Sequence, residues 1–151
     1  MKKRMMVVVV ATLLAVSALW HQATAATPEE AKDLVIRAAD ELKKVGKAKA
    51  YTEFSDTSGP FRHGDLYVFV FNFNGVWEAY PPKPDAVGIS LLDIKDVDGK
   101  EFVKEMISVA KTSGEGWVDY KWKNPETKKI QPKTSYIKTV DDVFVGAGVY
   151  K

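Results

Sequence analysis

Residues 66–80, LYVFVFNFNGVWEAY, decide the fold class of this chain. Residues 66–73 are almost wholly apolar and rich in β-branched and aromatic side chains, which predicts a strand buried on both faces. Asn74-Gly75 is the dipeptide that tight hairpin turns prefer, so residues 76–80 are expected to return as the partner strand. The stretch therefore predicts an antiparallel β-hairpin.

Three further strands are predicted in the last third of the sequence. Residues 117–122, 132–136 and 145–150 are short runs rich in aromatic or β-branched residues, and polar connections separate them. Because they follow one another closely, we expect them to be neighbours in one antiparallel sheet with the hairpin.

Helices are predicted on both sides of the hairpin. Residues 27–30, TPEE, combine a capping hydroxyl, a proline at the first helical position and a glutamate three residues after the cap, and the apolar stripe that follows ends near Gly46. A short helical stretch is expected at residues 48–54, and Asp98 is expected to cap a helix over about residues 100–111. The order helix, helix, hairpin, helix and three strands predicts an α+β domain with an antiparallel sheet.

The N-terminal residues have the pattern of a signal peptide. Residues 2–4 are basic, residues 5–20 carry no charge, and residues 23–25, ATA, form the small-x-small pattern that a signal peptidase needs. We therefore expect residues 1–25 to be a cleaved signal peptide and residues 26–151 to form one domain in the periplasm or outside the cell. The alternative is an uncleaved N-terminal anchor, which keeps the same orientation.

Charge and cysteine content narrow the classes of partner. Loss of the leader removes three basic residues of 22 and no acidic residue of 20, which leaves a net charge of about −1 in place of +2. The basic balance belongs to the leader, and this argues against a nucleic-acid partner. The chain contains no cysteine, so no disulfide is expected even in an oxidising compartment.

A lysine and several aromatic residues could meet over one face of the sheet. Side chains alternate along a strand, so Tyr67 and Phe69 share a face of the first strand, and Tyr120 and Trp122 share a face of a later one. If Lys133 joins them, two phenols and an ammonium could bind a carboxylate in a dry, ring-lined space. The alternative is that Lys133 is a solvated lysine at a strand end and the rings are ordinary core.

The chain resembles the single Cache domain, type 2, from about residue 28 to its end. The strings that carry this resemblance occur in the family's order: residues 64–71 (GDLYVFVF), 74–75 (NG), 96–100 (DVDGK), 116–122 (GWVDYKW), 124–125 (NP), 132–136 (PKTSY) and 145–150 (VGAGVY). The resemblance implies a PAS-like five-stranded antiparallel sheet behind a long N-terminal helix, with a further helix between strands 2 and 3. It also implies a domain that senses small organic acids outside the cell.

The resemblance implies a set of ligand contacts and also shows two departures from the family pattern. Lys133, Tyr67 and Tyr120 correspond to residues that can bind a carboxylate. The family often has a His-Pro pair where this chain has Tyr80-Pro81, and an aspartate where it has Asn72. A phenol can donate a hydrogen bond but carries no switchable charge near neutral pH.

The predicted function is therefore a non-enzymatic, exported domain that binds a short-chain carboxylate, with no cofactor and no metal ion. The predicted ligand-binding residues are Tyr67, Phe69, Tyr80, Trp117, Tyr120, Trp122, Lys133 and Ser135. The sequence stops directly after the last predicted strand, so we expect binding without a signalling output of its own.

Three alternatives remain open. The first is an interaction module with a vestigial pocket that binds a membrane-bound receptor or kinase. The second is a hydrolase that uses Lys133 and Ser135 as a nucleophilic pair. The third is a calcium loop that ends at Glu105, in which Ile94 occupies the position of the first ligand and so weakens the hypothesis.

Overall fold

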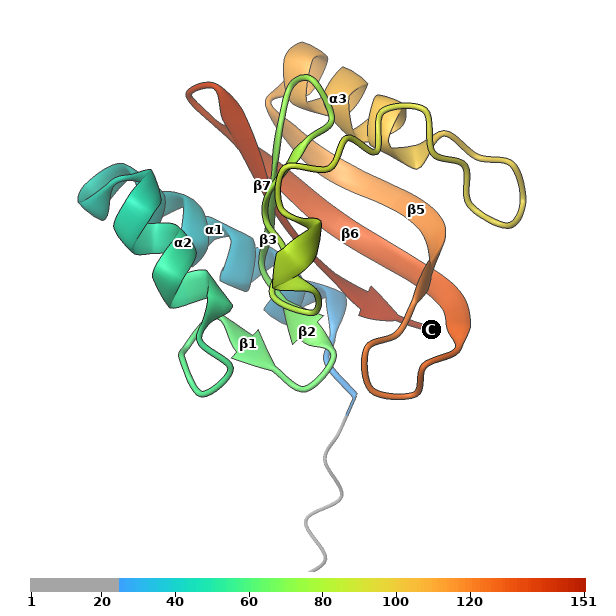
Figure 1. The fold of residues 1–151 in the computed structure, drawn as a ribbon, viewed down its shortest axis with the longest axis horizontal. Helices are drawn as coiled ribbons and strands as arrows, with labels where there is room; N and C mark the ends of the chain where they lie inside the picture. The colour runs from blue at the N-terminus through green and yellow to red at the C-terminus, as the bar shows by residue number, and fades with distance from the viewer. Residues whose placement is uncertain (1–24) are drawn as a thin grey trace, which may run out of the picture.

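The computed structural model describes residues 25–151, so the predicted signal peptide lies almost entirely outside the described residues. A five-stranded antiparallel sheet forms the centre of the domain, in the order β4-β3-β7-β6-β5 (Figure 1). Its strands are β3 (Phe69–Asn72), β4 (Trp77–Ala79), β5 (Glu115–Lys123), β6 (Ile130–Val140) and β7 (Val143–Tyr150). The predicted α+β fold class and PAS-like sheet are confirmed.

Helix α1 (Pro28–Val45) begins and ends as its local sequence predicts. The Thr27 hydroxyl accepts a hydrogen bond from the Glu30 backbone N–H, and the Glu30 carboxylate accepts one from the Thr27 backbone N–H at 2.7 Å. Gly46 ends α1 at a positive φ of 81° and starts the short helix α2 (Lys47–Ser55). Both predicted N-terminal helices are confirmed.

The hairpin of β3 and β4 is also confirmed, and its turn explains the residue at position 72. The Asn72 side-chain oxygen accepts hydrogen bonds from the backbone N–H groups of Asn74 and Val76, at 2.9 and 3.2 Å. Gly75 has a φ of 72°, which glycine adopts without a Cβ penalty. Asn72 therefore stabilises the turn, a role that an aspartate oxygen could also fill.

The predicted first strand is interrupted in the structure. Its first two residues form β2 (Leu66–Tyr67), which pairs with the two-residue strand β1 (Arg62–His63) as a separate small sheet. Residues 66–71 are all buried, as expected for a strand covered on both faces. The interruption at Val68 does not remove Tyr67 from the face that Phe69 lines.

The prediction that Asp98 caps the third helix is wrong. Helix α3 (Phe102–Ser113) has Glu101 at its N-terminal cap position and no side-chain cap. The Asp98 carboxylate instead pairs with the Lys121 ammonium at 2.9 Å. Asp96 makes the turn before α3, because its carboxylate accepts hydrogen bonds from three backbone N–H groups, those of Asp98, Lys100 and Lys121.

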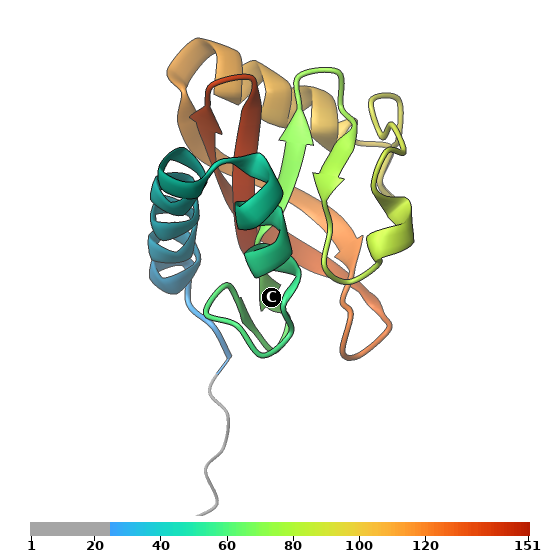
Figure 2. The same cartoon turned by 60° about the vertical axis from the view of Figure 1, so that its left-hand side comes forward.

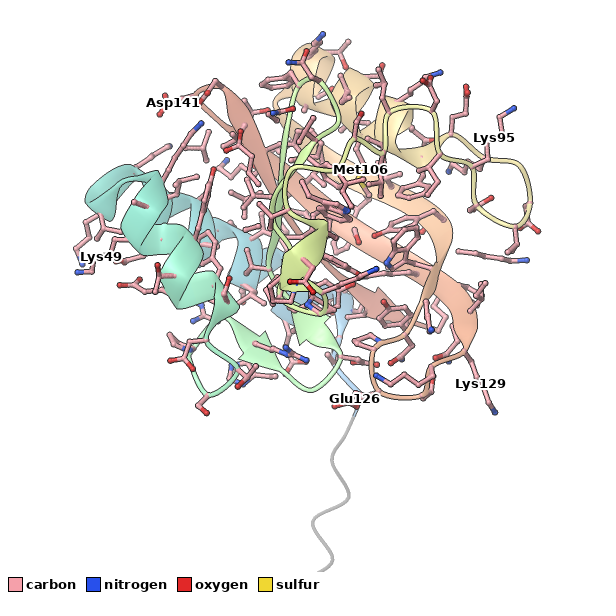
Figure 3. All side chains as sticks on the ribbon, in the orientation of Figure 1. Lys49, Lys95, Met106, Glu126, Lys129 and Asp141 are labelled. Carbon is pink, nitrogen blue, oxygen red and sulfur yellow. The ribbon has the colours of Figure 1, made fainter. Side chains whose placement is uncertain are left out.

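The two faces of the sheet are covered by different elements (Figures 1 and 2). Helices α1 and α2 pack on one face and form a core with the side chains of β3, β6 and β7 that point toward them. Helix α3, the 3₁₀ helix η1 (Pro84–Ala86) and the loop between them cover the other face, where Met106 is fully buried (Figure 3). Most aromatic residues of the candidate site lie in this second core.

Within residues 25–151, no helix combines the length and the apolar character that crossing a bilayer requires.

Candidate functional site

The register of the last three strands places Lys133 at the centre of a polar row. Tyr120 of β5 and Tyr150 of β7 are the direct partners of Lys133 across β6. Directly opposed residues have Cβ atoms about 5 Å apart, so their side chains share one face. The Lys133 side chain is buried, with 2% of its surface exposed.

The ammonium of Lys133 lies against phenols and ring faces. Its Nζ donates a hydrogen bond to the Tyr67 hydroxyl at 2.9 Å and a longer one to the Tyr150 hydroxyl at 3.4 Å. Nζ also lies 4.2 Å from the Tyr67 ring centroid, 4.7 Å from that of Tyr150 and 5.7 Å from that of Phe69. The Tyr150 hydroxyl donates onward to the Lys123 carbonyl at 3.0 Å.

The positive charge of Lys133 has no carboxylate partner within residues 25–151. Among the described residues, no carboxylate oxygen lies within 4.0 Å of its Nζ, in contrast to ten lysine–carboxylate pairs elsewhere in the domain. Burial lowers the pKa of Lys133 from 10.5 to about 7, and the more distant Asp65 opposes this shift only in part. Burial also raises the pKa values of Tyr67 and Tyr150, so both phenols stay protonated. The cluster of Lys133, Tyr67 and Tyr150 would be stabilised by an anion beside Nζ.

A second polar pair lies next to the lysine. The hydroxyls of Tyr120 and Ser135 are 3.0 Å apart, and the Tyr120 ring stacks on Phe102 of α3 with centroids 4.5 Å apart. Gly148 makes room for this pair, because a Cβ at position 148 would lie 2.1 Å from the Ser135 hydroxyl oxygen. Ser135 thus bonds to Tyr120, whereas Lys133 bonds to Tyr67, and the two do not form the nucleophilic pair of the hydrolase hypothesis.

Tyr80 and Trp122 form the outer cover of the cluster. The Trp122 indole N–H donates a hydrogen bond to the Tyr80 hydroxyl at 3.0 Å. The Tyr80 ring stacks on Trp77 at 4.3 Å and meets the Tyr67 ring edge-on at 5.9 Å. Outside this pair lies an open groove of about 590 Å³, whose lining includes Tyr80 and Trp122 but not Lys133.

The structure brings together seven of the eight predicted site residues. They are Tyr67, Phe69, Tyr80, Tyr120, Trp122, Lys133 and Ser135, and all lie on the face covered by α3 and η1 or border the groove over it. Trp117 does not join them: it packs against Tyr136 at 5.1 Å, on the face that carries α1, and 40% of its surface is exposed. Alternation along β5 explains this, since Trp117 and Tyr120 are three residues apart and point to opposite faces.

Sequence reasoning missed Tyr150 and Phe102. The signal for Tyr150 was present, because alternation along residues 145–150 puts Tyr150 on the same face as Gly146 and Gly148. A Cβ at Gly146 would lie 2.3 Å from the Phe69 ring, so these glycines leave space for pocket side chains. Phe102 could not be assigned, because its contact with Tyr120 depends on how α3 packs on the sheet.

The carboxylates of the calcium hypothesis do not converge on one point. Asp93 pairs with Lys104 at 2.9 Å, and Glu105 pairs with Lys100 at 3.0 Å. Among residues 25–151, no group of three or more acidic, histidine or cysteine side chains has the geometry of a metal site.

A five-stranded antiparallel sheet with helices on both faces and a closed polar cluster on one of them defines a PAS-like domain. Comparison with known proteins gives the particular family. A family model for the Cache domain matches residues 22–151, and the chain belongs to the Cache domain family. Cache domains are sensory modules of chemotaxis receptors and histidine kinases.

Two relatives are signalling proteins much longer than this chain. The chain is 36% identical over 88 residues to the sensor histidine kinase MctS of Rhizobium johnstonii, and 30% identical over 88 residues to the methyl-accepting chemotaxis protein McpP of Pseudomonas putida. Each alignment covers 57% of this chain but only 19% and 16% of the relatives. The chain thus spans less than a fifth of either relative.

Solved structures share the fold over most of the domain. A methyl-accepting chemotaxis protein from Vibrio parahaemolyticus superposes with a TM-score of 0.72 at 21% identity, over 81% of this chain and 86% of that one. A Cache chemosensory domain, solved to explain carboxylic acid recognition, superposes with a TM-score of 0.70 at 25% identity, over 81% of this chain and 91% of that one.

Proposed function

We propose that this Cache domain binds a small carboxylate beside Lys133 and acts outside the cytoplasm as a ligand sensor, without catalysis. The observation that carries the proposal is the buried, unpaired ammonium. A fully buried charge without a counter-ion destabilises a fold, so its presence in a ring-lined interior favours a binding role. The Cache chemosensory domain that recognises carboxylic acids supports the same ligand class.

The contacts divide the work of binding among the strands. Lys133 supplies the charge, and the phenols of Tyr67 and Tyr150 are within reach of the same anion. The Phe69 ring lies near Nζ, and the paired hydroxyls of Tyr120 and Ser135 lie next to the lysine. Tyr80 and Trp122 cover the site and exclude water, which strengthens the ion pair between Lys133 and the carboxylate.

Calorimetry with acetate, propionate, pyruvate and lactate tests this function. Wild-type protein is expected to bind at least one of these acids. Lys133→Met, which keeps an unbranched side chain one atom shorter and removes the charge, is expected to lower affinity by about 30-fold or more, or about 2 kcal/mol. Lys43→Met, at an exposed lysine of α1, is the control and should bind as the wild type does.

Equal affinity in wild type and Lys133→Met would remove Lys133 from the site. Binding that is lost in both lysine variants would point to a general charge effect instead.

One observation favours a second candidate function. Tyr67 and Tyr150 pack directly against Nζ, and the groove outside Tyr80 and Trp122 is not lined by Lys133. A closed cluster of this kind also fits an interaction module that binds a membrane-bound receptor or kinase with an unused pocket. The absence of any melting shift with carboxylates, together with co-purification of a membrane protein, would favour this second function.

A further inference from the structure

An apolar groove with a basic rim lies directly outside the candidate site. It runs between the loop that leads to α3, where Lys95 lies, and the connection from β5 to β6, where Lys129 lies (Figure 3). Its volume is about 590 Å³, which falls in the range of small-molecule sites. Tyr80 and Trp122 line it, so its inner side is the outer cover of the Lys133 cluster.

The groove exposes large apolar side chains to water. Ile89 is 52% exposed, Val97 is 61% exposed and Ile130 is 55% exposed. Isolated exposed apolar residues are common on protein surfaces, but these three border one concave site. A ligand with an apolar portion would cover them.

The charges around the groove favour an anion. Among residues 25–151, five of the lining residues are lysines, and Asp96 is the one carboxylate. The Asp96 oxygens already accept backbone hydrogen bonds, and Lys121 is paired with Asp98. The remaining lysines give the groove a positive rim that attracts a carboxylate toward Tyr80 and Trp122.

An aromatic layer, made of Tyr80 and Trp122, separates the groove from the cluster of Lys133 and Tyr67. Tyr80 lines the groove on one side and meets Tyr67 on the other, with ring centroids 5.9 Å apart. Tyr67 in turn accepts the 2.9 Å hydrogen bond from Lys133. Within the layer Trp122 donates a hydrogen bond to Tyr80, and the Tyr80 ring also stacks on Trp77.

We propose that the groove and the Lys133 cluster are two parts of one site, and that its ligand is a carboxylic acid with an apolar tail. The carboxylate lies beside Lys133, the tail passes between Tyr80 and Trp122, and its end covers Ile89 and Ile130 in the groove. This inference rests on the proposed function and adds the chemistry of the ligand's other end. The two side chains of the layer move apart to admit the tail, and the shared hydrogen bond is broken while the ligand is bound.

The length of the acid is the variable that tests the inference. Calorimetry with straight-chain acids from acetate to octanoate is expected to show affinity rising about fourfold for each added methylene once the tail passes the aromatic layer. The double variant Ile89→Ser with Ile130→Ser should abolish this rise and leave acetate and propionate unchanged. Both side chains are more than half exposed, so the double variant keeps the core.

Two control variants show whether the dependence of affinity on chain length arises in the groove. Ile36→Ser changes an exposed isoleucine of α1, which covers the opposite face of the sheet, and should keep the full rise with chain length. Lys133→Met should lose affinity for long and short acids alike, because the carboxylate of both lies at the same nitrogen.

The outcomes separate this inference from the proposed function. Affinity that is greatest for acids of two or three carbons, with no effect of the groove variant, overturns the inference and leaves carboxylate binding at Lys133 intact. Long acids that bind equally well to Lys133→Met overturn it too, because the head group then lies on the rim. Failure of every acid to bind overturns the proposed function and the inference with it.

Discussion

The variant Lys133→Met should make the domain more stable while it weakens carboxylate binding. The folded protein holds the Lys133 ammonium with 2% of its surface exposed and no carboxylate within 4.0 Å among the described residues. Its pKa falls from 10.5 to about 7, and a difference of this size corresponds to about 5 kcal/mol of unfavourable charging free energy. Methionine fills a similar volume without a charge. The phenol contacts that it loses cost about 1 kcal/mol, at any pH.

The pH dependence has a definite sign. Between pH 7 and 10.5 the unfolded chain keeps a proton on Lys133 that the folded chain has released, so wild-type stability rises with pH in that window. The penalty is fully present below about pH 7. Because Lys133→Met has no such proton, its stability advantage should shrink by about 3 kcal/mol between pH 6 and pH 9.

Urea unfolding of both proteins at pH 6, 7, 8 and 9 measures this difference. Lys43→Met, an exposed lysine of α1, controls for the general loss of one positive charge. Measurements stop at pH 9 because Tyr67, Tyr120 and Tyr150 have raised pKa values, and their unfolded forms begin to ionise near pH 10. Parallel stability curves for wild type and Lys133→Met would refute the view that this lysine is buried and unpaired.

Three other predictions follow from the same structure. Affinity for a carboxylate should fall as pH rises above 7, by up to tenfold per pH unit, because only charged Lys133 attracts the anion. Calorimetry at pH 6.5 and 8.5 measures this change, and equal affinities at the two pH values contradict the prediction. Gly146→Ala should lower the free energy of unfolding by about 1–3 kcal/mol, because the new Cβ would lie 2.3 Å from the Phe69 ring. An unchanged midpoint of urea unfolding would show that β7 has room for a side chain at this position. Thr27→Ala should cost about 1 kcal/mol by removing the cap of α1, and Thr27→Ser should restore most of it; equal melting temperatures for all three proteins would exclude a capping role.

Local signals in the sequence predicted the helices and the hairpin well. The start of α1 depends on residues 27–30 alone, since the capping box is made within a single turn. The turn at Asn74-Gly75 likewise needs only its own backbone and the Asn72 side chain. Such elements can be predicted from the sequence because their interacting groups are close along the chain.

The sequence predicted which residues form the site better than it predicted how they are arranged. Sequence alone left open whether Lys133 is solvated or enclosed, because that depends on strand register and on the covering loop. The structure shows it enclosed, opposite Tyr120 on β5 and Tyr150 on β7. Asp98 was assigned to the wrong partner for a similar reason, since Lys121 is 23 residues away along the chain.

The placement of tryptophans has a practical consequence for following the domain in solution. Trp122 gives its indole N–H to Tyr80 at the aromatic layer, and Trp77 stacks on the same tyrosine, whereas Trp117 lies on the opposite face of the sheet. Indole emission shifts when its hydrogen bond or its exposure to water changes. Of the three tryptophans within residues 25–151, two should therefore report by their fluorescence when the layer opens, and Trp117 should provide a steady background.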